Sequence, residues 1–284
     1  MRRTDSIEET RGVVRYWREH GHSVGLVPTM GFLHEGHVSL IRRARADNEK
    51  VAVSIFVNPT QFGPGEDYES YPRDLERDLS VLSEENVDLV FIPSPEQMYA
   101  KEHLVYVDVE SLGDVLCGAQ RPGHFRGVCT VVAKLFNIFR PDRAYFGQKD
   151  AQQLTIIRQM ARDLNFGVEI VRCPIVREPD GLALSSRNAY LSEKERKAAL
   201  VIPRSLSLAR NALENGERDA GRIRRIIAGE IEKEPLACIG YVEVVDASSL
   251  RPVERIDRPV LAAVAVKIGP ARLIDNFMYP EDSQ

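Results

Sequence analysis

The chain has 284 residues, of which 43% are hydrophobic and 28% charged, a composition typical of a globular protein with a sizeable core. Its 38 basic and 42 acidic residues give a formal net charge of −4, so no global positive field draws it to nucleic acid or anionic lipid. The amino-terminal residues lack the apolar core of a signal peptide, and the longest apolar stretches fall far short of the roughly 20 residues that cross a bilayer. We therefore expect a cytoplasmic protein that binds neither membranes nor nucleic acid.

The cysteines form no metal-binding or disulfide pattern. They include no C-x-x-C pair, and no histidine lies at ligand spacing from any of them. Free cysteine is usually a buried side chain. We expect reduced, mostly buried thiols at Cys117, Cys129, Cys173 and Cys238.

Helix-like and strand-like segments alternate along the amino-terminal half of the chain. Helical periodicity and short apolar runs predict helices over 7–20, 36–46 and 72–85, and strands over 24–27, 51–57 and 87–92. Alternation of this kind predicts a parallel sheet with helices on its faces.

The alternation continues to about residue 171. A helix is predicted over 127–140, because apolar residues recur at helical spacing and Pro141 ends the pattern. A strand over 144–146, a turn over 147–150, a helix over 151–164 and a strand over 168–171 follow. We expect residues 1–174 to form a Rossmann-like domain with a doubly wound parallel sheet.

The alternation of strands and helices gives way to a different pattern after residue 172. Turn residues at 173–174 and 178–181 come first. Two long charged helices over 192–215 and 219–232 and two strands over 241–245 and 260–267 are then predicted. We expect residues 175–284 to form a smaller α+β domain.

Residues 28–37, with the sequence PTMGFLHEGH, join the strand at 24–27 to the helix that follows. Ligands of an open parallel sheet bind beyond the carboxyl ends of its strands, where such a turn lies. Gly31 and Gly36 let a backbone approach a phosphate closely, and His34 and His37 can donate hydrogen bonds to phosphate oxygens. Taken alone, the two histidines are also explained as a surface residue and a helix cap.

Two later segments carry donors of the same kind. The turn at 147–150 repeats the arrangement of strand, turn and helix, and contains Lys149. Residues 184–188 bring two serine hydroxyls and the Arg187 guanidinium, which suit an oxyanion. Alone, this segment is also explained as a polar loop that leads into a helix.

Five sequence blocks together resemble the pantothenate synthetase family of pantoate–β-alanine ligases, relatives of the H-I-G-H nucleotidyltransferases. The H-x-G-H pattern alone is moderately specific for nucleotidyl transfer. All five blocks in order are highly specific, and the resemblance covers nearly the whole chain. The blocks lie at residues 28–37, 56–62, 121–128, 145–153 and 177–188.

The resemblance implies a reaction in two steps. The carboxylate of (R)-pantoate attacks the α-phosphorus of ATP, giving pantoyl adenylate and pyrophosphate, and β-alanine then displaces AMP to give pantothenate. Because a carboxylate is already ionised at pH 7, the first step needs no general base and depends on positioning and on stabilisation of phosphate charge. A site rich in donors and poor in acids fits this chemistry.

The resemblance also implies roles for individual residues. His37 corresponds to the family's proton donor, which we interpret as a donor to the leaving phosphate, and the catalytic set is His34, His37, Lys149 and Arg187. Gln61 and Gln153 correspond to the pair that binds pantoate, since an amide donates to a carboxylate and accepts from a hydroxyl. The implied ATP-binding residues are Met30, Gly31, Phe32, Leu33, His34, Glu35, Gly36, His37, Gly147, Gln148, Lys149, Asp150, Val176, Leu184, Ser185, Ser186 and Arg187.

Further expectations concern cofactors and assembly. Mg²⁺ is expected with ATP because it bridges phosphates and needs only one or two protein carboxylates, and Asp150 is the best-placed acid. No acidic residue stands out as a base for the amine of β-alanine. The resemblance implies a homodimer and a smaller domain that covers the active site.

Residues 63–72 form an irregular, glycine-containing segment directly after the Gln61 block. We hypothesise that it closes as a lid over the adenylate and protects this intermediate from water. An ordinary acidic surface loop is the alternative.

Two other functions fit parts of the pattern. One is an adenylyltransferase whose acceptor is a phosphate, but such an acceptor favours extra Arg or Lys over Gln61 and Gln153. The other is a nucleotide-sensing module without chemistry, which the intact His34, His37 and Lys149 disfavour.

Overall fold

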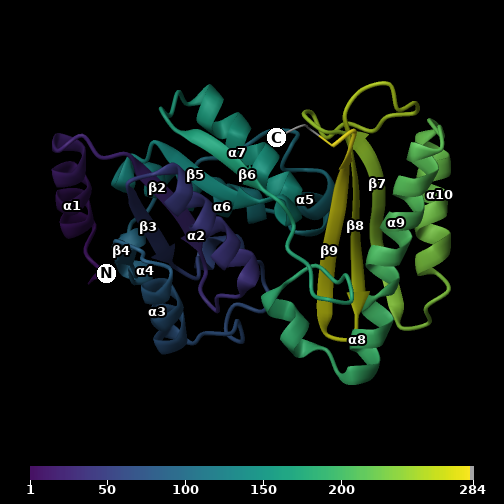
Figure 1. Ribbon diagram of the computed structural model, residues 1–284, viewed down its shortest axis with the longest axis horizontal. Helices are drawn as coiled ribbons and strands as arrows, with labels where there is room; N and C mark the ends of the chain where they lie inside the picture. The colour runs from purple at the N-terminus through teal and green to yellow at the C-terminus, as the bar shows by residue number, and fades with distance from the viewer. Residues whose placement is uncertain (282–284) are drawn as a thin grey trace. The chain divides into compact units, whose positions relative to one another are not determined.

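The computed structural model describes residues 1–281, which form two compact units (Figure 1). The first unit consists of Met1–Asp114, Gly118–Gln148 and Gln153–Pro174. The second consists of Val115–Cys117, Lys149–Gln152 and the residues from Ile175 onward. Two short segments that precede residue 174, one of which carries Lys149, therefore pack with the second unit.

A parallel sheet forms the centre of the first unit, which confirms the predicted fold class. Within residues 1–281 it has six strands in the order β1-β4-β3-β2-β5-β6, and each neighbouring pair is parallel. Strands β2 and β3 are apolar along most of their length because helices cover both faces of the sheet. The strands are β1 (Arg2–Thr4), β2 (Val24–Thr29), β3 (Lys50–Ile55), β4 (Leu89–Phe91), β5 (Arg143–Gly147) and β6 (Glu169–Cys173).

Helices connect these strands and cover the sheet. α2 (Glu35–Asp47) packs on β2, β3 and β5, while α1 (Ile7–Glu19) packs with α6 (His124–Phe139) and β2. The connections from β2 to β3 and from β5 to β6 run in opposite directions along the sheet, so right-handed crossovers place their helices on opposite faces. The other helical segments before β6 are η1 (Pro59–Gln61), α3 (Leu75–Glu84), α4 (Pro95–Met98), α5 (Leu116–Gln120), η2 (Gln148–Asp150) and α7 (Ala151–Asp163).

The second unit is built on an antiparallel sheet with its own apolar core. In the described chain its strands follow the order β7-β8-β9, and both neighbouring pairs are antiparallel. Buried residues of β8, such as Val264 and Val266, belong to the same core cluster as Ile223 and Ile227 of α10. The elements are η3 (Ser186–Tyr190), α8 (Glu193–Ala199), α9 (Val201–Glu214), α10 (Ala220–Ile231), β7 (Ala237–Asp246), β8 (Val260–Ile268) and β9 (Ala271–Tyr279).

Two features of the second unit differ from the sequence-based expectation. The single helix predicted over 192–215 is wrong, because α8 and α9 are separate helices that meet at Leu200. Pro203 explains the break, since its ring clashes with the carbonyl of a preceding helical turn. Strand β9 is not predicted by the sequence pattern, because Asp275 and Asn276 interrupt its apolar run although both side chains are buried.

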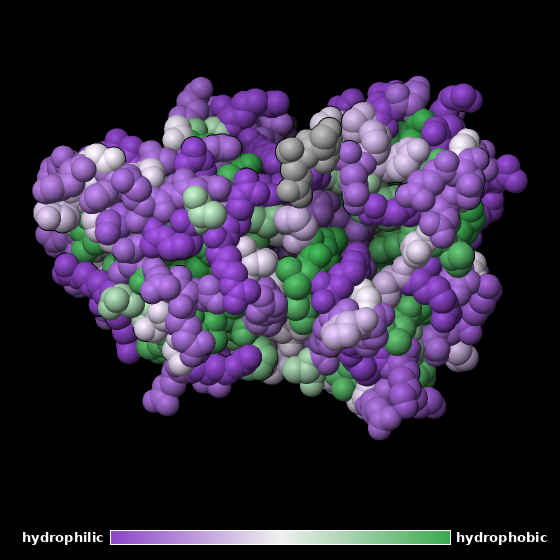
Figure 2. All heavy atoms as spheres, viewed as in Figure 1, coloured by the Kyte–Doolittle hydropathy of each residue, from purple (hydrophilic) through white to green (hydrophobic). Residues whose placement is uncertain are grey.

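The polarity of the surface and the state of the cysteines are as the sequence composition indicates. Hydrophilic residues cover most of the face shown in Figure 2, and hydrophobic residues appear there as small patches. The described chain contains no helix that is long and apolar enough to cross a membrane. All four cysteines are free, and burial raises the pKa of Cys129 to about 12 and that of Cys173 to about 11, so these two thiols stay protonated.

Candidate active site

The order of strands in the first unit reverses direction at β2. This strand pairs with β3 on one side and β5 on the other, and all three run parallel. The loop after β2, the η1 turn after β3 and the turn after β5 therefore leave the sheet at the same edge. Open α/β sheets bind ligands in the crevice at such a point.

The loop after β2 uses its backbone donors internally. Gly31 N–H donates to the Thr29 hydroxyl at 3.2 Å. The N–H groups of Phe32 and Leu33 donate to the carboxylate of Asp78 at 2.8 and 2.7 Å. These three amides are therefore not available to a phosphate, although the glycine pattern indicates that they would be.

The two histidines of the loop begin α2 and cap each other. Gly36 N–H donates to His34 Nδ1 at 3.1 Å, and His34 N–H donates to His37 Nδ1 at 3.3 Å. The ring centroids are 4.1 Å apart. Because both Nδ1 atoms accept, the hydrogen of each neutral ring is on Nε2, and both rings are hydrogen-bond donors through that atom. His34 is therefore the cap of α2 and His37 completes the capping box, whereas the simpler interpretation made His34 a surface residue and His37 the cap. Both rings also present a donor of defined tautomer.

Gln61 lies at the end of η1, beside the loop after β2. Its Nε2 lies 3.1 Å from Met30 Sδ, and its Oε1 accepts from Asn58 Nδ2 at 3.1 Å. Asn58 is only 1% exposed and also donates to the Gly127 carbonyl at 3.1 Å. The amide group of Gln61 is thus held in one orientation by a buried neighbour.

Helix α6 approaches η1 so closely that only glycine fits at position 127. A Cβ atom there would collide with the Thr60 carbonyl oxygen and lie 2.7 Å from Gln61 Cα. Both obstacles are backbone atoms, which cannot rotate away. Gly127 therefore sets the position of the turn that carries Gln61.

The segment over 63–72 is anchored to the first unit by an ion pair. Arg121 donates to both carboxylate oxygens of Glu66, at 2.7 and 2.6 Å, and to the Gln61 carbonyl at 3.3 Å. Burial raises the pKa of Glu66, but Arg121 outweighs this effect and the pKa lies below its usual value. The lid role of this segment stays a hypothesis.

The second unit brings Lys149 together with the loop that contains Ser185. Both residues line a cavity of about 10 Å³, together with Asn188 and Asp275. Burial lowers the pKa of Lys149, an effect that Asp150 and Asp275 partly oppose and Arg187 reinforces. Lys149 and Ser185 belong to separate sequence blocks, and the fold of this unit makes them neighbours.

Hydrogen bonds within the second unit fix the loop around Ser185. Leu184 N–H donates to the Val176 carbonyl at 3.0 Å, so these two predicted nucleotide-binding residues pair directly. Arg187 N–H donates to the Ser185 hydroxyl at 3.3 Å. The buried carboxylate of Asp275, 2% exposed, accepts from Arg177 at 2.6 and 3.0 Å. Arg177 is thereby held at the start of the loop.

Three residues that support these donors are not among the candidates that the sequence pattern indicates. Asp78 contacts the loop after β2, Asn58 orients Gln61, and Asp275 lines the cavity beside Lys149. Asn58 lies inside a recognised block, which was its only signal. Of the other predicted residues, Gln153 lies on α7, and Asp150 is exposed at the end of η2.

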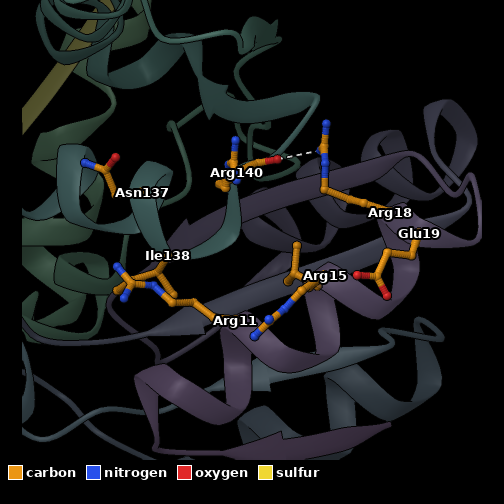
Figure 3. Close-up of a pocket in the computed structure, with 8 residues that line it drawn as sticks. Arg11, Arg15, Arg18, Glu19, Asn137, Ile138 and Arg140 are labelled. Atoms are coloured by element: carbon orange, nitrogen blue, oxygen red, sulfur yellow. Dashed lines mark hydrogen bonds between the residues drawn. The ribbon is translucent and has the colours of Figure 1, made fainter.

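A larger cavity of the first unit lies away from this edge of the sheet. It has a volume of about 810 Å³ and is formed by α1 and the end of α6 (Figure 3). Both helices end shortly before β2 and β5 begin, so the cavity is near the amino ends of these strands. Its Arg18 guanidinium is already bound to the Arg140 carbonyl at 2.7 Å. We therefore place the candidate site at the carboxyl ends and not here.

Comparison with known proteins matches the chain to one family along nearly its whole length. The family model described as Pantoate-beta-alanine ligase matches residues 2–278. A pantothenate synthetase of Thermotoga neapolitana is 58% identical over 276 residues, which cover 97% of this chain and 99% of that protein.

Two solved structures share the fold. The pantothenate synthetase of Thermus thermophilus is 46% identical with a TM-score of 0.93, and the match covers 98% of this chain and 99% of that one. The pantoate-beta-alanine ligase of Francisella tularensis, complexed with beta-gamma ATP and beta-alanine, is 34% identical with a TM-score of 0.80, and covers 98% and 97%. With a family model, a close relative and two structures in agreement, the chain belongs to the pantoate-beta-alanine ligase family, enzymes that join pantoate to β-alanine.

Proposed function

We propose that the chain condenses (R)-pantoate with β-alanine in two steps that consume ATP. In the first, a pantoate carboxylate oxygen bonds to the α-phosphorus while the bond from that phosphorus to pyrophosphate breaks. In the second, the amine of β-alanine attacks the acyl carbon, AMP leaves with its electron pair, and the amine loses a proton. The observation that carries this proposal is the pair of imidazoles whose Nε2 donors are set by mutual capping. The Francisella tularensis relative in complex with beta-gamma ATP and beta-alanine supports it.

The donors of the site suit phosphate chemistry without a base. His34 and His37 donate to phosphate oxygens through Nε2, and Lys149 and Arg187 add positive charge to the leaving pyrophosphate. Donors that are already oriented stabilise the developing charge without reorganising during the reaction. The carboxylate nucleophile is ionised at neutral pH, so the first step needs no acidic residue as base.

Gln61 is the best-supported pantoate ligand. Its neighbours Asn58 and Met30 are neutral, and the nearby Arg121 is paired with Glu66. A neutral amide that both donates and accepts suits a hydroxy acid. The same surroundings disfavour a phosphate acceptor, which would call for unpaired positive charge. We assign Gln153 to the same substrate on the family resemblance.

Mg²⁺ fits this site as a partner of the triphosphate. Residues 1–281 contain no group of three or more His, Cys, Asp or Glu side chains that could hold a metal ion. Mg²⁺ bound to ATP needs only one or two carboxylates from the protein. The exposed carboxylate of Asp150, next to Lys149, would hold the Mg²⁺ ion, and the ion would neutralise phosphate charge.

We also propose that the enzyme is a homodimer. Leu104 and Val105 are 85% and 76% exposed on a segment that belongs to no helix or strand within residues 1–281. A second copy would cover these apolar side chains.

Isotope exchange between pyrophosphate and ATP tests the first step. Exchange should require pantoate and not β-alanine, because pantoyl adenylate forms reversibly. His37→Ala should lower the exchange rate at least about a hundredfold, the scale of losing one oxyanion donor. Asp246→Ala, in a turn of the second unit, is the control that keeps the exchange. Exchange without pantoate, or an unchanged rate in His37→Ala, would contradict the proposal.

Gly127→Ala should weaken pantoate binding. The added Cβ forces η1 away from α6 and displaces Gln61, so we expect KM for pantoate to rise about tenfold or more while KM for ATP changes less. Steady-state kinetics with each substrate varied in turn measure this. Gly229→Ala is the control, because a Cβ there meets nothing within 4 Å. Equal KM values for pantoate in wild type and Gly127→Ala would remove Gln61 from the pantoate site.

Because of Lys149, ATP binding should weaken at alkaline pH. Its pKa is lowered, so the ammonium loses its charge at a lower pH than an ordinary lysine near 10.4. Above that pKa the Kd for ATP should rise by about tenfold per pH unit, because only the charged form attracts phosphate. The Lys149→Arg variant stays charged over this pH range, so its Kd for ATP should rise less at alkaline pH. Calorimetric titration between pH 7 and 10 measures both proteins, and an identical alkaline rise in the variant would count against the role of Lys149.

Replacing Leu104 and Val105 together by Lys should separate the dimer. Charge on these side chains opposes burial against a second copy, so the mass measured by light scattering should fall by half. Leu208→Lys on α9, where Leu208 is 42% exposed, is the control that keeps the dimer. A monomeric wild type would refute the proposed homodimer. A double variant that stays dimeric would show that Leu104 and Val105 do not form the dimer interface.

A further inference from the structure

Asp78 is a buried carboxylate that accepts hydrogen bonds from backbone amides. It lies in the first turn of α3 and is 1% exposed. Its two oxygens accept from the N–H groups of Phe32 and Leu33, at 2.8 and 2.7 Å. Among residues 1–281, no ion pair involves Asp78. A buried carboxylate needs compensation, and these two charge-assisted hydrogen bonds provide it.

The amides that Asp78 accepts belong to a turn with unusual backbone geometry. Gly31 and Phe32 both have positive φ, 82° and 50°. This region is unfavourable for a phenylalanine and persists only where neighbouring contacts hold it. A Cβ at Gly31 would lie 2.9 Å from Asp78 Oδ2, so the carboxylate sits directly against the turn.

The turn has the form of an anion-binding concavity, and Asp78 fills it. Successive backbone N–H groups in such turns converge on anions, and many nucleotide sites use them for phosphate. Here the anion is the chain's own carboxylate. A phosphate is excluded from these amides by occupancy and by like charge, and the next residue along the chain is His34, the first of the two capping histidines.

We propose that Asp78 is a positioning residue for the nucleotide. By filling the concavity of Gly31, Phe32 and Leu33, its carboxylate holds the turn that begins α2 and directs the Nε2 donors of His34 and His37 toward phosphate. The inference rests on the proposed function, because it takes ATP as the ligand of these histidines.

Asp78→Asn is the principal variant. Asparagine keeps the shape and one acceptor, but its NH₂ group faces the second backbone N–H. Hydrogen exchange of the Phe32 and Leu33 amides should become at least tenfold faster than in wild type. The Kd for ATP, measured by calorimetry, should rise tenfold or more, while KM for β-alanine changes less than twofold.

Asp78→Ala gives a rescue test that a general loss of stability would not pass. Removal of the carboxylate leaves a space of that size beside two unpaired N–H donors, and formate fits both the space and the donors. Millimolar formate should restore ATP binding in Asp78→Ala at least fivefold, and should not do so in Asp78→Asn, where the space stays filled. Circular dichroism establishes that both variants are folded.

The matched control is Asp246→Ala in the second unit. Asp246 also accepts from two backbone N–H groups of a turn, those of Ser248 and Ser249 at 3.0 and 2.8 Å. Its loss should lower thermal stability and leave the Kd for ATP within twofold of wild type. A folded Asp78→Asn with wild-type affinity for ATP, or an Asp78→Ala that formate does not rescue, overturns the inference.

The hydrogen-exchange readout separates this inference from the proposed function. A wild type that does not bind ATP refutes the proposed function, and with it any nucleotide role of Asp78. A different result is that the Phe32 and Leu33 amides exchange as slowly in Asp78→Asn as in wild type. That result would refute the hydrogen bonds to Asp78 themselves, whatever ligand the enzyme binds.

Discussion

The parallel pairing of β2 with β3 on one side and β5 on the other is the constraint on which the site depends. The register aligns Thr29 with Ile55 and Ala144 with Leu26, so three loops from distant parts of the sequence leave the sheet at one edge. Helices on both faces bury these strands and make the pairing rigid. The loop with the histidines, the turn with Gln61 and the start of η2 are therefore held by buried, paired strands of the first unit.

The proposed nucleotide site resembles other nucleotide sites in position but differs in which groups are left to face a ligand. The loop after β2 has glycine at position 31 and a turn of positive φ, yet its amides at 32 and 33 are bound by Asp78. Histidine side chains then supply the donors, and their tautomers follow from the capping hydrogen bonds. An imidazole donor is directional and uncharged in its neutral form, so it orients a phosphate without holding the product as strongly as a cation would.

Supporting residues recur behind each proposed ligand. Asn58 orients Gln61, Gly127 lets α6 approach the same turn, and Asp275 lines the cavity beside Lys149. These groups are buried and have fixed partners, so the ligands they support lose little freedom when substrate binds. Chemistry that relies on positioning and charge stabilisation, and on no strong base, benefits directly from this arrangement.

Sequence alone determined the alternation of helices and strands, the parallel sheet, the family and the blocks that hold the proposed ligands. These features depend on local periodicity or on contiguous residues, which can be read within a short window. Only the tertiary structure decided the break before Pro203, the buried polar residues of strand β9, the neighbourhood of Lys149 and Ser185, and the burial of Asp78 against the loop after β2. Asp78 is 45 residues from Leu33 and looks in the sequence like any acid on a helix. Packing α3 against the loop after β2 removes its carboxylate from water, and only that long-range contact turns a common surface residue into an internal anion.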